Sequence, residues 1–460
     1  MSNGPNTFDI VILAAGQGKR MQSRLPKVLH RLANRPLLEH ITRTLYELIP
    51  DKKPIVVYGH GGEQIQKTLG HLSVEWVLQS KQLGTGHALQ QALPYLQSPQ
   101  VLVLCGDVPL ISGDTLKKLI STTTVDALGL VTANFPDPSG LGRIVRDEAG
   151  HVQDIVEEKD ASEKQRKIKE INAGIYFFPT ELIKKGLPTI ENNNAQQEYY
   201  LTSILSQAIQ NKYPIHTIQP NAIEEVQGVN DRIQLSHLER YLQKQLAEKF
   251  MRQGVTLSDP ARFDVRGDLS VGQDVTIDIN VIVEGYVKIG NECVIGPHTV
   301  LRNVILGDRV EIKAHSIIDG AEIAADAIIG PFARIRPGTV LASRTHVGNF
   351  VEIKNSNIGE GSKINHLSYV GDSKIGKQVN VGAGTITCNY DGVAKHRTII
   401  GDHAFIGSNT QLVAPITIGE GATIGAGSTI TRDAPPNQLT LCRTQQRSIP
   451  HWQRPQKKEE

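Results

Sequence analysis

The chain has 460 residues, of which 39% are hydrophobic and 21% charged, a length that suits two or three domains with their own cores. Its formal net charge of +2 predicts neither a nucleic-acid-binding surface nor an acidic tail. The four cysteines lack C-x-x-C spacing, the first residues do not read as an export leader, and no apolar run approaches a membrane span. We therefore expect a cytoplasmic protein with free thiols that binds neither nucleic acid nor membrane.

The first half of the chain alternates short apolar runs with amphipathic stretches. Between Leu37 and Leu48, for example, aliphatic residues recur at helical spacing. The expected strands are Ile10–Leu13, Ile55–Tyr58, Val101–Leu104, Ala127–Thr132 and Ile175–Phe178. Continuous apolar strands separated by helices predict a Rossmann-like α/β domain with a mostly parallel sheet, which we place at residues 1–229.

A glycine-rich turn follows the first expected strand. It reads Ala14-Ala15-Gly16-Gln17-Gly18-Lys19-Arg20-Met21, with Lys27 shortly beyond. Such a turn presents backbone N–H groups to phosphate oxygens, and two cations, Arg20 and Lys27, could neutralise a triphosphate. The turn is not the dinucleotide fingerprint, because Met21 stands where the third glycine would be, and it lacks the Gly-Lys-Ser/Thr of a Walker loop. The alternative is a plain strand-to-helix turn with solvated cations.

A single carboxylate, Asp107, follows the run Val101–Leu104. The carboxyl ends of strands in open α/β sheets bind ligands, and Mg²⁺ prefers a carboxylate together with substrate phosphates. A cap for the next helix or turn is the alternative role. Gln79 and the turn Gly84-Thr85-Gly86 offer an amide for a base edge and a second close-approach turn.

One helix is predicted for residues 230–253, and we expect it to link two domains. An apolar stripe is expected to run along it, and Gly254 is a plausible stop signal. The residues of this stripe are Ile233, Leu238, Leu242, Leu246 and Phe250.

From about Ile289 to Ile430 the chain repeats a six-residue unit that begins with Ile, Leu or Val. A period of six fits neither a helix nor an alternating strand, but it is the mark of a parallel β-helix whose aliphatic residues point inward. The clearest inward positions are Ile323, Ile329, Ile335, Leu341, Val347, Ile353, Ile400, Ile406, Leu412, Ile418, Ile424 and Ile430. We place this domain at residues 254–443 and expect residues 444–460 to form a flexible tail.

The hexads also carry polar residues that a scaffold does not need, and the period breaks at a loop, residues 389–397. Loops that interrupt a solenoid often supply binding groups. His366 follows the inward Ile364 by two residues, so its side chain could point outward and act as a base near neutral pH. An ordinary surface histidine is the alternative.

The motifs around these residues resemble the signature of sugar-1-phosphate nucleotidyltransferases, Leu-x-x-Gly-x-Gly-x-Arg-Met followed by Leu-Pro-Lys. The match is narrowed by Gln79…Gln82-Leu-Gly-Thr-Gly-His87, Gly142-Arg-Ile, Ile155-Val-Glu-Glu-Lys159, Glu170-Ile-Asn-Ala-Gly174, Asn192-Asn-Asn-Ala-Gln196…Glu198-Tyr-Tyr200 and Gly228-Val-Asn230. With the β-helix added, the chain from Ile10 to Arg443 resembles the bacterial family of bifunctional N-acetylglucosamine-1-phosphate uridyltransferases and glucosamine-1-phosphate N-acetyltransferases.

For the first half, the resemblance implies a magnesium-dependent attack of N-acetylglucosamine-1-phosphate on UTP. It assigns the nucleotide to Leu13, Ala14, Ala15, Gly16, Lys27, Gln79, Gly84, Thr85, Cys105, Gly106 and Asp107. It assigns catalysis to Arg20 and Lys27, Mg²⁺ to Asp107 and Asn230, and the sugar phosphate to Gly142, Glu157, Asn172 and Asn230. Three residues depart from the family pattern. Cys105 stands where Tyr is common, Leu141 where an aromatic residue is common, and Glu158 where His is frequent. We expect altered contacts there, not altered chemistry.

For the second half, Gly361-Ser-Lys-Ile-Asn-His366-Leu-Ser-Tyr369-Val-Gly-Asp372 resembles the family's acetyltransfer segment. The resemblance implies that His366 is the general base, that Arg336, Lys354, Tyr369 and Asn380 hold glucosamine-1-phosphate, and that acetyl-CoA lies against Ala383, Asn389, Tyr390, Lys395, Ser408, Ala426 and Arg443. It also implies a left-handed β-helix and a homotrimer with acetyl-CoA between adjacent prisms. Two rivals remain at this point: a single-activity sugar-1-phosphate pyrophosphorylase whose β-helix serves oligomerisation or regulation, and a non-catalytic relative with an assembly role.

Overall fold

The structure, a computed structural model, describes residues 8–59 and 61–455. It divides into two compact units, Met1–Leu242 and Gln243–Glu460. The division falls within one helix, α8 (Arg232–Arg252), which occupies nearly the range predicted for the linker. The domain limits that we drew from the sequence remain predictions, and residues 456–460 of the predicted tail lie outside the described residues.

The first unit is built on a twisted sheet with the strand order β11-β7-β10-β6-β1-β4-β5. Neighbouring strands are parallel except where β10 pairs with β6 and β7. The strands are β11 (Ile215–Ile218), β7 (Leu128–Asn134), β10 (Glu170–Pro179), β6 (Gln100–Cys105), β1 (Phe8–Ala14), β4 (Ile55–Tyr58) and β5 (Glu75–Leu78). Each of the five apolar runs that we interpreted as strands is present, so the predicted mostly parallel sheet is confirmed.

Helices cover both faces of this sheet, which explains why its central strands are mostly apolar. On one face the packed helices are α1 (Leu37–Leu48), α2 (Gly62–Leu69) and α4 (Gly113–Thr122). On the other they are α3 (Thr85–Ala92), α6 (Thr180–Gly186) and α7 (Thr202–Gln210). A small hairpin, β8 (Arg143–Arg146) with β9 (Val152–Val156), pairs with β10. At the carboxyl edge of the sheet, the ends of β1 and β6 line an open cavity.

Helix α8 has an apolar stripe, but one predicted member does not belong to it. Leu238 lies in the core of the first unit, and Phe250 lies in the core of the second. Ile233 is 82% exposed, so its placement on the stripe was wrong. Five residues separate it from Leu238, which turns its side chain about 140° around the helix axis, whereas Leu235 lies three residues away and faces the core.

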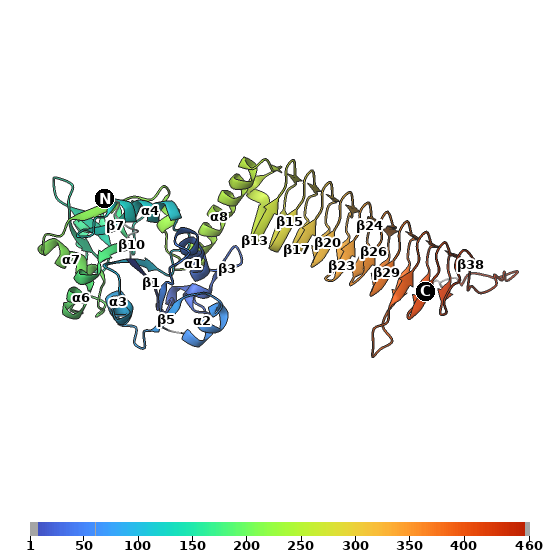
Figure 1. Ribbon diagram of the computed structural model, residues 1–460, viewed down its shortest axis with the longest axis horizontal. Coiled ribbons are helices and arrows are strands. Elements are labelled where there is room, and N and C mark those ends of the chain that lie inside the picture. The colour runs from blue at the N-terminus through green and yellow to red at the C-terminus, as the bar shows by residue number, and fades with distance from the viewer. Residues whose placement is uncertain (1–7, 60, 456–460) are drawn as a thin grey trace, which may run out of the picture. The chain divides into compact units, whose positions relative to one another are not determined.

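The second unit is a parallel β-helix of stacked coils (Figure 1). Inward residues on successive coils pair 17 or 18 positions apart, as Ile312 does with Ile329 and Ile329 with Val347, so each coil contains three hexads. The coils begin at β12 (Thr256–Leu257), earlier than the hexads first stand out in the sequence, and end at β38 (Leu439–Thr440). Every hexad residue that we predicted to point inward is at most 3% exposed, which confirms the aliphatic ladders.

The coils form a prism with three faces. Face 1 contains β24 (His346–Asn349), β27 (Lys363–His366) and β30 (Asn380–Val381). Face 2 contains β22 (Arg334–Ile335), β25 (Glu352–Lys354), β28 (Tyr369–Gly371) and β31 (Ile386–Cys388), and face 3 contains strands such as β29 (Ser373–Ile375) and β32 (Thr398–Ile400). The predicted loop, residues 389–397, leaves the stack between β31 and β32 (orange in Figure 1).

The last turns of α8 close the open end of this prism. Ala247 and Phe250 pack into its aliphatic core. The buried Gln243 side chain accepts a hydrogen bond from Val265 N at 2.7 Å and donates one to Val265 O at 2.9 Å. Val265 belongs to β13 (Phe263–Val271), near the start of the coils.

Two sequence expectations can be compared with these elements. The four cysteines are free thiols, as predicted. Within residues 8–59 and 61–455, no helix has both the length and the hydrophobicity that a membrane crossing requires.

Candidate active sites

A cavity of about 610 Å³ opens in the first unit where β1 and β6 end. Twelve of the residues that we predicted for the nucleotide, the metal and catalysis line it. They are Leu13, Ala14, Ala15, Gly16, Arg20, Lys27, Gln79, Gly84, Thr85, Cys105, Asp107 and Asn230. The structure therefore brings residues from distant parts of the chain into a single concave site.

Gly16 and Gly18, the two glycines of the first turn, have different roles. Gly18 has a φ of 62°, and a Cβ there would lie only 2.7 Å from the Cβ of Lys27. A side chain at Gly18 would therefore push Lys27 out of the site. A Cβ on Gly16 would meet no protein atom within 4 Å, although Gly16 lines the cavity. The space above Gly16 is open to a ligand and is not needed by the fold.

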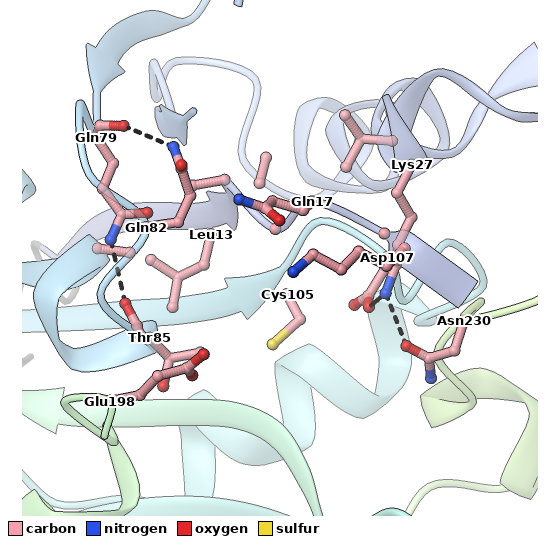
Figure 2. Close-up of a pocket in the computed structure, with 18 of the residues that line it drawn as sticks. Leu13, Gln17, Lys27, Gln79, Gln82, Thr85, Cys105, Asp107, Glu198 and Asn230 are labelled. Atoms are coloured by element: carbon pink, nitrogen blue, oxygen red, sulfur yellow. Dashed lines mark hydrogen bonds and ion pairs between the residues drawn. The ribbon is translucent and has the colours of Figure 1, made fainter. Parts of the chain in front are cut away.

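Lys27 connects the two residues predicted to hold the metal. Its ammonium forms an ion pair with Asp107 and donates a hydrogen bond to Asn230 Oδ1 at 2.8 Å (Figure 2). Lys27 is held on a short helical turn, Lys27–Leu29, directly after Pro26. The Asp107 carbonyl also accepts a hydrogen bond from Val229 N at 2.9 Å, which ties the segment before Asn230 to the end of β6.

This arrangement fits a magnesium site of the kind that substrate phosphates complete. The Asp107 carboxylate and the Asn230 amide oxygen converge on one cation, the Lys27 ammonium. Within the described residues no group of three or more His, Cys, Asp or Glu side chains could hold a metal ion. Mg²⁺ commonly uses one or two carboxylates plus phosphate oxygens, so two protein oxygens are a plausible donor set.

At another part of the cavity, a buried amide is fixed beside the second turn. Gln79 is 2% exposed, and its Nε2 donates to Gly84 O at 3.2 Å and lies 2.9 Å from His87 Nδ1. Its backbone carbonyl accepts a hydrogen bond from Gln82 Nε2 at 3.1 Å (Figure 2). Thr85 begins α3, and its hydroxyl accepts a hydrogen bond from Leu201 N at 3.1 Å.

The remaining predicted residues of the first unit are absent from the cavity wall, but three of them meet one another. A Cβ on Gly142 would lie 3.5 Å from Glu157 Oε2 and 3.6 Å from the Cβ of Asn172. Asn172 N donates to Gly142 O at 2.9 Å, and Thr202 Oγ1 donates to Glu157 Oε1 at 3.1 Å. Burial raises the pKa of Glu157.

Gly106 does not line the cavity but supports a residue that does, because its N–H donates a hydrogen bond to Leu13 O at 2.8 Å.

Cys105 lines the cavity and contacts Gly174, two residues after Asn172, which we predicted to bind the sugar. Its thiol donates to Gly174 O at 3.3 Å, and its pKa is raised to about 12, chiefly by burial and also by the Asp107 carboxylate. The side chain is therefore a neutral thiol near pH 7 and does not act as a nucleophile. It contributes its shape and a weak hydrogen bond to the site.

Sequence reasoning missed several residues of the cavity wall. They are Gln17, Gly18, Lys19, Val28, Gln82, Ala88, Lys159, Gln196 and Glu198. Lys159 Nζ donates to Gln196 Oε1 at 2.9 Å, so the segment around Gln196 is tied to the one that carries Glu157. Motif strings contained several of these residues, but only the fold shows that they reach the cavity.

In the β-helix, four predicted residues gather at the end of face 2 where the loop leaves. A Cβ on Gly371 would lie 2.5 Å from the Tyr369 hydroxyl and 2.8 Å from Asn389 Nδ2. Lys354 is paired in register with Gly371. Lys354 also lowers the pKa of the exposed Lys395 through its hydrogen bond and its charge, so the two ammonium groups are close.

An acidic group balances these lysines. Asn355 Nδ2 donates to Asp372 Oδ1 at 2.6 Å, and Asn389 Nδ2 donates to the other carboxylate oxygen. Burial opposes ionisation, but these hydrogen bonds hold the pKa of Asp372 below its usual value. Arg336 lies on a neighbouring coil and donates to Glu352 Oε1 at 2.7 Å. The cluster is thus cationic and polar on a scaffold that is otherwise aliphatic inside.

His366 is exposed at the end of β27 on face 1, as we expected of an outward-pointing side chain. Its Nδ1 lies 2.8 Å from Asn349 Oδ1, on the neighbouring strand β24. A neutral imidazole that donates from Nδ1 to this amide oxygen keeps its lone pair on Nε2, where a base needs it. Asn380, at the start of β30, lies on the same face.

Three residues predicted for acetyl-CoA form a column on successive coils. Asn409 N donates to Ala383 O at 2.7 Å, and Gly427 N donates to Ser408 O at 2.8 Å, so the turns of Ala383, Ser408 and Ala426 stack. A Cβ on Gly425 would lie 3.8 Å from the guanidinium of Arg443, which places this cation beside the column. Tyr390 is 61% exposed at the base of the loop.

Three family models match the chain. The MobA-like NTP transferase domain matches residues 10–162, the GMPPB C-terminal domain residues 265–349, and the bacterial transferase hexapeptide (six repeats) residues 397–432. The hexapeptide match agrees with the three hexads of each coil and with a left-handed β-helix.

Full-length relatives share about half of the sequence. Bifunctional protein GlmU of Marinobacter nauticus is 53% identical over 97% of this chain and 99% of its own length. The chain belongs to the GlmU family. The GlmU proteins of Nitrosomonas europaea and Nitrosospira multiformis are 55% and 54% identical, each over 98% of both chains. GlmU family membership confirms the resemblance read from the motifs and confirms the fold class, an α/β nucleotidyltransferase domain followed by a left-handed β-helix.

Proposed function

We propose that this bifunctional transferase of UDP-N-acetylglucosamine synthesis carries out its two reactions at two separate sites, one in each unit. The β-helix acetylates glucosamine-1-phosphate with acetyl-CoA, and the α/β unit joins the product to UTP with release of pyrophosphate. The observation that carries the first assignment is the convergence of Lys27, Asp107 and Asn230 beside an open glycine turn. GlmU family membership supports both activities and disfavours a single-activity pyrophosphorylase.

In the α/β unit the protein holds and neutralises charge, and it forms no bond to the substrate. The phosphate oxygen of N-acetylglucosamine-1-phosphate attacks the α-phosphorus of UTP, and the bond to pyrophosphate breaks. Lys27 and the exposed Arg20 stabilise the added negative charge, while the open space above Gly16 admits the phosphates. Gln79, Gly84 and Thr85 hold the uridine, and the Gly142, Glu157 and Asn172 group holds the acetylated sugar.

Asp107 and Asn230 would hold Mg²⁺ in this reaction. A bound ion would supply positive charge beside the substrate phosphates. The Lys27 ammonium can exchange the Asp107 carboxylate for a phosphate as its ionic partner.

In the β-helix, His366 acts as the general base. Its Nε2 takes a proton from the glucosamine amine as the nitrogen attacks the thioester carbonyl, and the thiolate of coenzyme A leaves. Asn389, Tyr390 and Ser408 line the thioester, where a donor stabilises the oxyanion. Arg336 and Lys354 hold the sugar phosphate, with Tyr369 and Asn380 against the sugar. The column of Ala383, Ser408 and Ala426 leaves room for the cofactor arm, and Lys395 and Arg443 face its phosphates.

The working assembly that we propose is a homotrimer in the cytoplasm. His366 and Asn380 lie on face 1, whereas Arg336, Lys354, Tyr369 and Asn389 belong to face 2 and its end. Neighbouring prisms packed around a threefold axis would bring face 1 of one chain to the cationic cluster of the next. The sugar nucleotide that the enzyme makes would be used in cell-wall synthesis, for peptidoglycan and, in suitable bacteria, for lipopolysaccharide.

One experiment tests the two-site assignment. The purified chain is incubated with glucosamine-1-phosphate, acetyl-CoA, UTP and Mg²⁺, and release of free thiol and of pyrophosphate is followed over time. Asp107→Asn should abolish pyrophosphate release and leave thiol release intact. Chelation of Mg²⁺ should do the same. Loss of both products in either case, from protein that remains folded, would refute the separation of sites.

A further inference from the structure

The side chain of Arg143 is an unusual feature of the first unit, because it is charged and yet only 1% exposed. It begins β8, one residue after Gly142. A buried guanidinium is costly unless it is paired, so its partners deserve an account.

The partners of Arg143 come from three separate segments. One terminal nitrogen donates to Leu141 O, and the other forms an ion pair with Glu158. The second nitrogen also donates to Arg166 O at 3.4 Å, at the end of the short helix α5 (Glu163–Arg166). Arg166 returns a hydrogen bond from Nε to Glu158 O, also at 3.4 Å. Both Leu141 and Glu158, which depart from the family pattern, thus contact the same guanidinium.

Two of these contacts, Leu141 and Glu158, are adjacent in sequence to a predicted sugar contact. Gly142 lies between Leu141 and Arg143, and Glu157 precedes Glu158. In the sheet, Arg143 is paired with Ile171, the neighbour of Asn172, and with Val156, the neighbour of Glu157. The guanidinium therefore links the Leu141 carbonyl to the Glu158 carboxylate across the point where Gly142 and Glu157 approach each other.

We propose that Arg143 and Glu158 are positioning residues that hold Gly142 and Glu157 at the separation that N-acetylglucosamine-1-phosphate requires. The inference rests on the proposed function, because it assumes that these two residues bind the sugar. Neither Arg143 nor Glu158 lines the cavity that holds Lys27 and Gln79. The pair should consequently set the affinity for the sugar phosphate and leave that for UTP unchanged.

The test compares Michaelis constants for the two substrates in the full-length chain. Glu158→Gln keeps the size of the side chain and removes its charge. We expect its KM for N-acetylglucosamine-1-phosphate to rise about fivefold or more, as for loss of one charged hydrogen bond, with KM for UTP within about twofold of wild type. Glu158→Asp keeps the charge and should show a smaller rise. Glu148→Gln makes the same chemical change at an exposed residue between β8 and β9 and should behave as wild type.

The alternative outcomes are distinct. An unchanged sugar KM in Glu158→Gln, or an equal rise in both constants, would overturn the positioning role. If thermal melting shows that Glu158→Gln does not fold, Glu158→Asp decides by the same comparison, with a rise of about twofold or more in the sugar KM alone as the supporting result. An inactive wild-type chain under these conditions would instead refute the proposed uridyltransferase.

Discussion

The ammonium of Lys27 lies 2.8 Å from the amide oxygen of Asn230, although 203 positions separate the two residues in the chain. The same ammonium is paired with Asp107. One cation therefore holds together the helical turn Lys27–Leu29, the end of a central strand and the segment that leads into α8.

Replacing Lys27 by Met tests the role of this cation. The variant keeps the aliphatic stem but leaves Asp107 and the substrate phosphates without the ammonium. We expect kcat/KM for pyrophosphate release to fall about 100-fold or more, with acetyl transfer unaffected. Lys118→Met removes an exposed cation from α4 and serves as the control. Equal activity of the two variants would remove Lys27 from the mechanism.

Gly16→Ala tests whether a ligand uses the space above the first turn. No protein atom lies within 4 Å of the added methyl group, so thermal stability should match wild type. The methyl group would obstruct the phosphates. We therefore expect KM for UTP to rise about tenfold, which corresponds to a loss of about 1.4 kcal/mol in binding free energy. Gly113→Ala, at the start of α4, adds a methyl group that is equally free of contacts and lies outside the cavity. Normal UTP kinetics in Gly16→Ala would show that phosphates do not approach this glycine.

With N-acetylglucosamine-1-phosphate and UTP supplied directly, His366→Ala should release pyrophosphate as wild type does. Its acetyl transfer to glucosamine-1-phosphate should fall about 100-fold or more, because the amine would lose its proton acceptor. Asn349→Ala should cause a smaller loss, since the imidazole would remain but its tautomer and direction would no longer be fixed. His403→Ala removes another exposed histidine of the β-helix as the control. Full thiol release by His366→Ala would disprove the general-base role.

The buried Glu157 predicts a pH dependence for sugar binding. Burial raises its pKa, so on acidification the carboxylate takes up a proton at a higher pH than an ordinary glutamate does, above about pH 4.3. A protonated carboxyl accepts hydrogen bonds less well, and KM for N-acetylglucosamine-1-phosphate should rise as the pH falls through this range. Glu157→Gln cannot titrate, so its sugar KM should lack this dependence. The same KM profile in both proteins would exclude Glu157 as the titrating group.

Much of the architecture was predictable because it depends on local periodicity. The six-residue period identified the β-helix, since each aliphatic residue such as Ile353 must point inward for the coils to stack. The apolar strands of the first unit were equally clear. The error at Ile233 arose from treating a residue five positions from Leu238 as part of its stripe, although helical rotation separates the two.

The contacts within the sites were harder to predict. The glycine turn and Asp107 could be recognised by their positions after strands, but nothing in the spacing places Asn230 beside Lys27. The Arg143–Glu158 pair depends on the register of the β8–β9 hairpin, which brings residues 15 positions apart into contact. Such pairings are set by tertiary packing, and the periodicity of a sequence carries no information about them.

The bond between Gln243 and Val265 has a consequence for any attempt to dissect the protein. A stack of parallel coils ends in a strand whose hydrogen-bonding groups can recruit another chain, and in an aliphatic core that would otherwise meet water. The final turns of α8 cover that end: Phe250 packs into the aliphatic core, and the Gln243 side chain hydrogen-bonds to the backbone N–H and C=O of Val265. A C-terminal fragment that begins after Arg252 would lack this cover and be prone to end-to-end association. An isolated acetyltransferase should therefore begin upstream of Gln243.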